Sequence, residues 1–336
     1  TMIAAKPGLF LFPGAGAVGR LRVAGLGAVA SRAALKRAQQ HLVTSADVID
    51  WLPERSAGSH KGTYGRVLVV GGSANYTGAP ALSAHGAYRM GAGLVTLGVP
   101  SPLVNTLAGG FYEGTWLHLP HDLGALNAGG AGLVRHEAEQ CDALVIGMGI
   151  GREAETRDFL LNLLAGGRTA AHRPIGFSGA APSTLAQAAE LPALIVDADG
   201  LALLAELPDW PTLLPAGTVL TPHPGEMARL CGLSTQDVVD WRWELAAAKA
   251  KEWGVTLLLK GAHTFVAAPD GSARVLPFKT SALATAGTGD VLAGMIAALR
   301  AQHVSAPEAA AAAAYVHGLA GLKAAQIMGS ERAVCA

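Results

Sequence analysis

Charged side chains are scarce in this sequence. Of its 336 residues, 25 are Lys or Arg and 25 are Asp or Glu, so 15% are charged and the formal net charge at pH 7 is zero. Average usage is about 25% charged residues. A chain without net positive charge has no general attraction for nucleic acid or for an anionic membrane. The composition therefore favours an enzyme that acts on a small molecule.

Cysteine is also rare. Cys141, Cys231 and Cys335 are far apart and odd in number, which gives neither a disulfide framework nor a metal-binding spacing. Unpaired thiols are typical of a reducing compartment. Gly, Pro or Asp interrupts each long charge-poor run, so we expect no transmembrane helix. Lys6 precedes an apolar stretch, as in a signal peptide, but Pro13 interrupts that stretch, and we expect a cytoplasmic protein.

Apolar residues and glycine are abundant instead, at 51% and 43 residues respectively. From about residue 62, continuous runs rich in Val, Leu and Ile alternate with helix-forming stretches. Such runs are typical of strands buried on both faces of a mostly parallel sheet. The alternation predicts an α/β sandwich with helices on both faces. The expected strands are residues 66–70, 94–99, 142–147, 193–199, 218–222 and 255–261.

Two stretches carry clear helix signals. Residues 237–253 have apolar side chains at helical spacing, and Gly254 is a typical C-terminal stop. Residues 307–325 are rich in alanine, the best helix former. Residues 1–45 are rich in Gly and Ala and show no alternation of strand and helix.

The segment ATAGTGDVLAGMI, residues 284–296, places Asp290 directly before an apolar run. The spacing of that run predicts a buried helix that begins near Gly289. The first N–H groups of a helix bind anions, and Gly287 and Gly289 let a phosphate approach the backbone. A carboxylate in the same turn suits a base for a substrate hydroxyl that meets a phosphoryl group. The alternative is that Asp290 only stabilises the helix N-terminus.

The segment VLTPHPGEMARL, residues 219–230, holds His223 between two prolines directly after an expected strand. The prolines fix the backbone and hold the imidazole in one place, which favours a role in a site. Glu226 falls in the first turn of the next helix, where a negative charge is favourable. The alternative is a rigid turn whose histidine packs or caps.

Lys260 lies at the end of the expected strand 255–261, and Thr264 begins a hairpin arm whose turn is Pro269-Asp270-Gly271. A lysine at the carboxyl end of a strand is well placed to contact a phosphate or a ribose. The alternative is a solvated lysine on a surface hairpin.

Other polar and Gly-rich stretches also follow strands, where ligands of open α/β sheets bind. Asp197 and Asp199 either hold Mg²⁺ through water, as hard oxygen ligands do, or cap the next element. The turns at 71–79 and 147–151 each have half of a dinucleotide fingerprint, but neither has the complete pattern, which disfavours a hydride-transfer site. His317 lies on the Ala-rich helix, where we expect it to pack against neighbours and not to take part in chemistry.

Together these stretches resemble one family. KGTYGRVLVVGGSANYTGA, ALVIGMGIG, LIVDADGL, LTPHPGE, LKGAHT and ATAGTGDVLAGMI occur in the order seen in ADP/ATP-dependent NAD(P)H-hydrate dehydratases, the carboxy-terminal domain of YjeF-type repair proteins. The resemblance covers about residues 43–325 and implies a ribokinase-like three-layer α/β/α sandwich. It also implies dehydration of the S-form hydrate of NADH or NADPH, driven by ADP or ATP with Mg²⁺ as the nucleotide's companion.

The resemblance also implies roles for individual residues. Asp290 corresponds to the base, and the backbone of Gly287, Thr288 and Gly289 to the anion hole. Ala79, Gly149, His223 and Asp290 match positions associated with the hydrate. Asp197, Asp199 and Glu226 could meet Mg²⁺ through water. Nucleotide contacts map to Lys260, Gly261, Ala262, His263, Thr264, Thr280, Ser281, Ala282, Leu283, Ala284, Thr285, Ala286, Gly287, Thr288 and Gly289.

The chain departs from the family pattern in three regions. Residues 279–282, KTSA, stand where an Asn-Pro element is common, and DADG at 197–200 replaces the commoner DADA. Leu322, after His317-Gly-Leu-Ala-Gly, stands where an Asp is often found. The first residues resemble the end of the NAD(P)H-hydrate epimerase domain but hold no complete epimerase site. We therefore expect residues 1–42 to be a remnant or linker that packs against a dehydratase domain at 43–330.

Two other functions are compatible with parts of the sequence. A small-molecule kinase of the hydroxymethylpyrimidine or hydroxyethylthiazole type would share the anion hole and the base, but the Thr-Pro-His-Pro-Gly-Glu string favours the dehydratase. A nucleotide-binding module without catalysis is disfavoured, because a phosphate binder gains nothing from Asp290. The high apolar content with few charges predicts a homo-oligomer.

Overall fold

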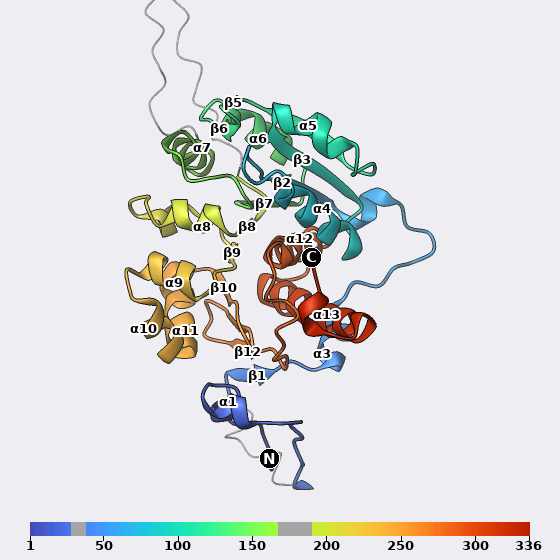
Figure 1. Ribbon diagram of the computed structural model, residues 1–336, viewed down its shortest axis with the longest axis vertical. Coiled ribbons are helices and arrows are strands. Elements are labelled where there is room, and N and C mark those ends of the chain that lie inside the picture. Colours follow the sequence, from blue (N-terminus) through green and yellow to red (C-terminus); the bar gives the residue numbers. More distant parts are fainter. Residues whose placement is uncertain (28–37, 167–189) are drawn as a thin grey trace, which may run out of the picture.

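The computed structural model describes residues 1–27, 38–166 and 190–336. A ten-stranded sheet with the order β1-β12-β11-β10-β9-β8-β7-β2-β3-β4 runs through it (Figure 1). Among the described strands of this sheet, β11 alone runs antiparallel to its neighbours. The strands are β1 Gln40–Leu42, β2 Arg66–Val70, β3 Leu94–Pro100, β4 Thr115–Leu119, β7 Ala143–Ile146, β8 Ala193–Val196, β9 Val219–Leu220, β10 Thr256–Leu259, β11 Phe265–Ala267 and β12 Ala273–Val275, with a separate pair β5 His121–Asp122 and β6 Ala125–Leu126.

The central strands are buried on both faces, as their continuous apolar runs predict. Along β2, Val67 and Val69 face one core cluster, whereas Leu68 and Val70 face the other. The same alternation repeats in β7, β8 and β10. Each strand therefore needs apolar residues at every position, because a helical layer covers each face.

Helices cover both faces and complete three layers (Figure 1). One layer holds α6 Gly130–Ala138, α7 Ala154–Ala165, α8 Asp199–Leu204, α9 Pro224–Cys231, α10 Thr235–Asp240 and α11 Arg242–Trp253. The other holds α3 Ser45–Trp51, α4 Ala79–Arg89, α5 Ser101–Ala108, α12 Thr288–Ala301 and α13 Ala306–Met328. The predicted α/β/α sandwich is confirmed.

The helix expected at 237–253 is in fact two. Ser234 caps α10. The C-cap of α10 is Trp241, where φ is −115° and ψ is 26°. The chain then turns into α11, which ends at Gly254 as predicted. The prediction of one helix was wrong. It placed Trp241 on the apolar face, but Trp241 is 65% exposed, and the break between the two helices turns Trp243, which is 3% exposed, into the core.

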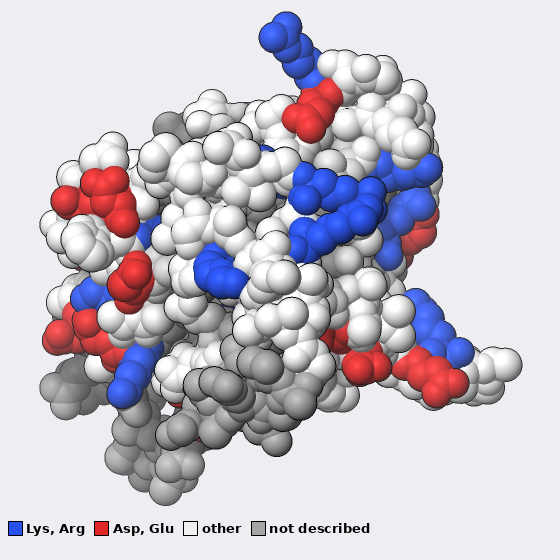
Figure 2. All heavy atoms as spheres, turned by 90° about the horizontal axis from the view of Figure 1, so that it is seen from below, with Lys and Arg blue, Asp and Glu red and all other residues white. Residues whose placement is uncertain are grey.

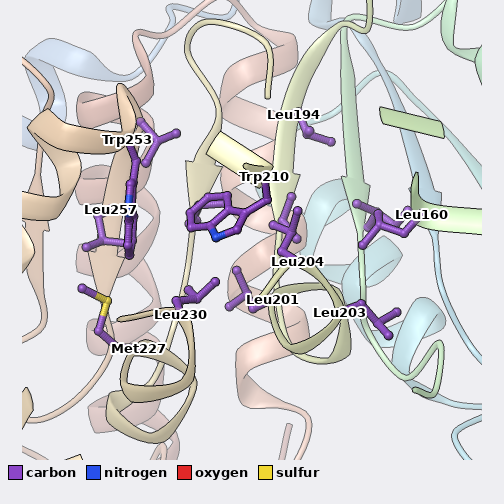
Figure 3. Close-up of a cluster of buried hydrophobic side chains, with 14 of the residues drawn as sticks. Leu160, Leu194, Leu201, Leu203, Leu204, Trp210, Met227, Leu230, Trp253 and Leu257 are labelled. Atoms are coloured by element: carbon purple, nitrogen blue, oxygen red, sulfur yellow. The ribbon is translucent and has the colours of Figure 1, made fainter. Parts of the chain in front are cut away.

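Large side chains fill the core between the sheet and the α7–α11 layer (Figure 3). The rings of Trp210 and Trp253 pack edge to face with centroids 4.8 Å apart. Leucines from α8 and α9 surround Trp210. Buried aromatic pairs of this kind add directional attraction to the apolar area that they bury.

Helices α4 and α12 touch through their backbones. A Cβ on Gly86 would lie 2.3 Å from the Val291 carbonyl oxygen, and one on Gly294 would lie 1.8 Å from that of Ser83. Only glycine permits this approach, which holds α12 rigidly against α4. The position of the first turn of α12 therefore depends on these two glycines.

The surface agrees with the low charge content. Figure 2 shows a face that is mostly uncharged, with several separate groups of Lys and Arg and of Asp and Glu. Among the described helices, none is both long and apolar enough to cross a membrane.

We predict that Gly294→Ala lowers the free energy of unfolding by about 2–3 kcal/mol, because the added methyl group overpacks a backbone contact. Gly132→Ala in α6 is the matched control, since a Cβ there meets nothing within 4 Å. Alanine should stabilise that exposed position by up to about 1 kcal/mol. Urea unfolding of both variants measures the difference, and equal stabilities would contradict the contact.

Candidate active site

The two Gly-rich turns meet where the strand order reverses, between β2 and β7. Ligands of open α/β sheets bind at such a point. The Gly72 N–H donates to the Met148 carbonyl oxygen at 2.8 Å. Gly149 has a φ of 65°, and a Cβ there would lie 2.5 Å from the Tyr76 Cβ and 3.2 Å from the Ala79 Cβ. The structure thus brings Ala79 and Gly149 side by side.

Helix α12 has an open N-terminus at the carboxyl edge of the sheet. Its N-cap, Gly287, has a φ of 91°, which glycine adopts without strain. The Thr288 hydroxyl donates to the carbonyl oxygens of Leu283 and Thr285 at 2.8 and 2.9 Å, which fixes the preceding loop. Gly287 has no side chain, so the N-cap residue makes no side-chain hydrogen bond to the first N–H groups of α12. Its first N–H groups can therefore bind an anion.

Lys260, directly after β10, extends its ammonium to the start of α12. Its Nζ lies 2.7 Å from Asp197 Oδ1 and 3.8 Å from Glu226 Oε2, and a Cβ on Gly289 would lie 3.4 Å from it. The Asp197 side chain is 1% exposed. Burial disfavours the charged ammonium, but the carboxylates outweigh it and raise the pKa of Lys260. A permanent positive charge thus lies beside the helix N-terminus.

Asp290 lies in the first turn of α12 and is half-buried. Burial and then the negative charge of Asp197 raise the pKa of Asp290 to about 7, against the opposing effect of Lys260. Asp199 raises it further. A carboxyl group that titrates near neutral pH is well matched to accept a proton from a substrate.

His223 caps α9 and forms a capping box with Glu226. Its Nδ1 accepts from the Gly225 and Glu226 N–H groups at 3.0 and 3.3 Å, and the backbone N–H of His223 donates to Glu226 Oε2 at 2.8 Å. Burial and the charge of Lys260 lower the pKa of His223, whereas burial raises that of Glu226. The His223 side chain is nevertheless 56% exposed. The alternative in which His223 caps a helix is therefore confirmed, and its Nε2 also lies 3.4 Å from Glu226 Oε1.

The carboxylates predicted as possible magnesium ligands have ion-pair or hydrogen-bond partners within the chain. Asp197 pairs with Lys260, and Asp199 accepts from the Gly151 N–H at 3.2 Å and from Arg152 Nε at 2.7 Å. Residues 1–27, 38–166 and 190–336 contain no group of three or more His, Cys, Asp or Glu placed to hold a metal. This donor set fits a Mg²⁺ carried on nucleotide phosphates and reached through water.

A cavity of about 230 Å³ opens beside Lys260, between the loop after β10, the loop before α12, and α13. Its lining is apolar at Leu276, Phe278 and Leu292, and its polar lining includes Lys260, Thr288 and His317. Nine residues predicted to contact the nucleotide line it: Lys260, Gly261, Ala262, Thr264, Thr280, Leu283, Ala284, Thr288 and Gly289. An apolar slot with a cation and a helix N-terminus at one end suits a base and its phosphates.

The other predicted nucleotide residues lie outside the cavity lining, namely His263, Ser281, Ala282, Thr285, Ala286 and Gly287. His263 is 7% exposed and lies behind the wall. Thr280 donates to Glu331 Oε1 at 3.0 Å, and both the N–H and the hydroxyl of Ser281 donate to Glu331 Oε2. The C-terminal segment thus holds the loop before α12 in place from outside the cavity. No sequence motif around Glu331 predicts this role.

Arg242 is a second residue that motif reasoning missed. Its guanidinium donates to the carbonyl oxygens of Lys260 and Ala262 at 3.2 and 3.3 Å. A Cβ on Gly261, whose φ is 148°, would lie 2.8 Å from Arg242 Nη2. Arg242 therefore holds the loop that carries Lys260.

Comparison with known proteins identifies the family. The family model for NAD(P)H-hydrate dehydratase matches residues 67–334. The chain belongs to this family. It is 34% identical to the ADP-dependent (S)-NAD(P)H-hydrate dehydratase of Nitrosopumilus maritimus, over 83% of the chain and 88% of that protein.

The fold and the longer relatives agree with this family. The crystal structure of the Bacillus subtilis ADP/ATP-dependent NAD(P)H-hydrate dehydratase, co-crystallised with ATP and Mg²⁺, superposes with a TM-score of 0.66 at 27% identity, covering 88% of the chain and 92% of that structure. The bifunctional NAD(P)H-hydrate repair enzyme Nnr of Moorella thermoacetica is 40% identical over 98% of the chain. The chain spans 58% of that relative's length. The resemblance of residues 1–42 to an epimerase domain stays a prediction.

We predict that Asp290→Asn stabilises the fold at pH 8 but not at pH 4.5. The folded pKa of about 7 lies above the ordinary value of 3.8, so the folded protein loses stability as pH rises from about 4 to 7 and the carboxyl group ionises. Asparagine removes that penalty, which we expect to be about 1–2 kcal/mol after solvent screening at this half-buried site.

Urea unfolding at the two pH values measures the effect of Asp290→Asn. Asp158→Asn is the control, because the Asp158 side chain is 56% exposed. Equal effects of Asp290→Asn at both pH values would contradict the raised pKa.

Proposed function

We propose that this chain dehydrates the S-form hydrate of NADH or NADPH back to the reduced cofactor, in a reaction driven by ADP or ATP. The observation that carries the proposal is the open N-terminus of α12, with Asp290 in its first turn and the Lys260 ammonium beside it. This arrangement supplies a base, an anion site and a positive charge within one turn of helix.

In the proposed first step, Asp290 takes the proton of the hydroxyl group on the damaged ring. The hydroxyl oxygen then attacks the terminal phosphorus of the nucleotide, and the bond to the leaving nucleotide breaks. The N–H groups of the Gly287–Gly289 turn and Lys260 stabilise the charge on the phosphoryl oxygens. Mg²⁺ on the nucleotide would neutralise further charge.

In the second step the phosphorylated ring loses inorganic phosphate. Hydroxide is a poor leaving group, whereas phosphate leaves readily with the electron pair of the C–O bond. The adjacent ring carbon then loses a proton to water, and the electrons of that C–H bond restore the double bond of the dihydronicotinamide. The hydrate would lie against Ala79 and Gly149, with the exposed edge of His223 facing it. The adjacency of Ala79 and Gly149 supports this placement.

The comparisons favour this reaction over the kinase alternative, because the named relatives are hydrate dehydratases and repair enzymes. ADP is the preferred candidate, since the Nitrosopumilus relative is named ADP-dependent. The bifunctional relatives support a functional link to an epimerase. A dehydratase domain at 43–330, a homo-oligomer and a cytoplasmic location stay predictions.

We expect recovery of the reduced-nicotinamide absorbance when the protein is incubated with NADH hydrate, Mg²⁺ and ADP, and with ATP in a parallel reaction. Turnover should rise with pH through about 7, because Asp290 must be ionised to accept the proton. Asp290→Asn should lower turnover at least about 100-fold while nucleotide still binds.

The matched control is Asp158→Asn, which should leave turnover unchanged. Phosphorylation of a small alcohol without any recovery of absorbance would overturn the dehydratase in favour of the kinase. Full activity of Asp290→Asn would overturn the assignment of the base.

A further inference from the structure

The N-terminal segment, residues 1–18, contacts the back of the loop that forms the nucleotide cavity. Phe10 is 5% exposed and belongs to the core cluster between the sheet and α11. Its ring packs edge to face on His263 with centroids 5.0 Å apart, and it lies 6.2 Å from the Trp243 ring. His263 stands between Ala262 and Thr264, which both line the cavity.

His263 has a conformation that needs support. Its φ is 52°, in the left-handed region that costs a residue with a side chain roughly 1 kcal/mol or more. Such a residue persists only when its surroundings fix it. The contacts that fix His263 are its N–H to the Phe278 carbonyl oxygen at 2.8 Å, its Nδ1–H to the Leu276 carbonyl oxygen at 3.1 Å, and the Phe10 ring.

A second, adjoining stretch of the cavity wall is tied to the same segment. Lys279 lies between Phe278 and Thr280, both of which line the cavity. Its Nζ donates to the carbonyl oxygens of Ala15 and Val18 at 2.7 and 2.9 Å. These carbonyl groups lie at the end of α1, Gly14–Ala17, where a cation is favourable.

We propose that the segment 1–18 sets nucleotide affinity, with Phe10 and Lys279 as positioning residues for two adjoining stretches of the wall of the nucleotide cavity. Phe10 keeps His263, and with it Ala262 and Thr264, in the binding conformation. Lys279 holds the wall of Phe278 and Thr280 against the segment. Neither residue lines the cavity, so each acts through its neighbours.

The proposal rests on the proposed function in naming a nucleotide as the ligand, but its first test needs no turnover. We would titrate each variant with fluorescently labelled ADP. Phe10→Ala and Lys279→Met should each weaken binding about tenfold, because the loops relax from the binding conformation. Val23→Ala is the control, since Val23 lies in the same N-terminal region and is 45% exposed.

Steady-state kinetics separate a positioning role from general destabilisation. The KM for ADP should rise about tenfold, while the KM for the hydrate and kcat at saturating ADP stay within about twofold. Lys279→Arg, which keeps the positive charge and the donors, should restore the KM for ADP. Far-UV circular dichroism checks that each variant is folded, and Lys279→Met decides the outcome if Phe10→Ala does not fold.

Unchanged ADP affinity in folded Phe10→Ala and Lys279→Met would overturn the proposal. So would a parallel rise in both KM values, because that pattern indicates a general loss of structure. Absence of dehydratase turnover in the unmodified protein would instead overturn the proposed function, and the ADP titration would still decide the role of the segment.

Discussion

The buried ion pair between Lys260 and Asp197 joins the ends of β10 and β8 to the start of α12. Removing two charges from water costs several kcal/mol per ion, so such a pair is weak support for stability. Its effect here is to fix an ammonium group beside Gly289, where the first N–H groups of α12 also point. The same ammonium limits the rise in the pKa of Asp290, which keeps that carboxyl group in the range where it can exchange protons near neutral pH.

Rigid elements hold the groups that the proposed reaction uses in fixed positions. The glycine contacts between α4 and α12 leave no room for α12 to shift. Arg242 holds the loop after β10 through its carbonyl groups, and Glu331 braces the loop before α12 from the other side. Side chains far apart in the sequence thus hold the backbone groups that the proposed reaction uses.

The sequence predicted the sheet and the start of α12 well, because continuous apolar runs and Gly-Thr-Gly-Asp act locally. It also identified Lys260, which the structure places beside α12, from its position after a strand. It could not show that Asp197 pairs with Lys260, because residues 63 apart along the chain meet only in the fold. Arg242 and Glu331 were missed for the same reason, and the one-helix prediction at 237–253 failed because periodicity does not reveal a break at Trp241.

The central claim is that the ring hydroxyl is phosphorylated at the helix N-terminus before it leaves. Its most direct test uses NADH hydrate whose hydroxyl carries ¹⁸O, with ADP as the phosphoryl donor. Mass spectrometry of the released inorganic phosphate then reports where that oxygen goes. We expect the label in the phosphate, because the hydroxyl oxygen becomes the bridging atom of the intermediate and departs with phosphorus. Label found only in water, with unlabelled phosphate, would contradict the account.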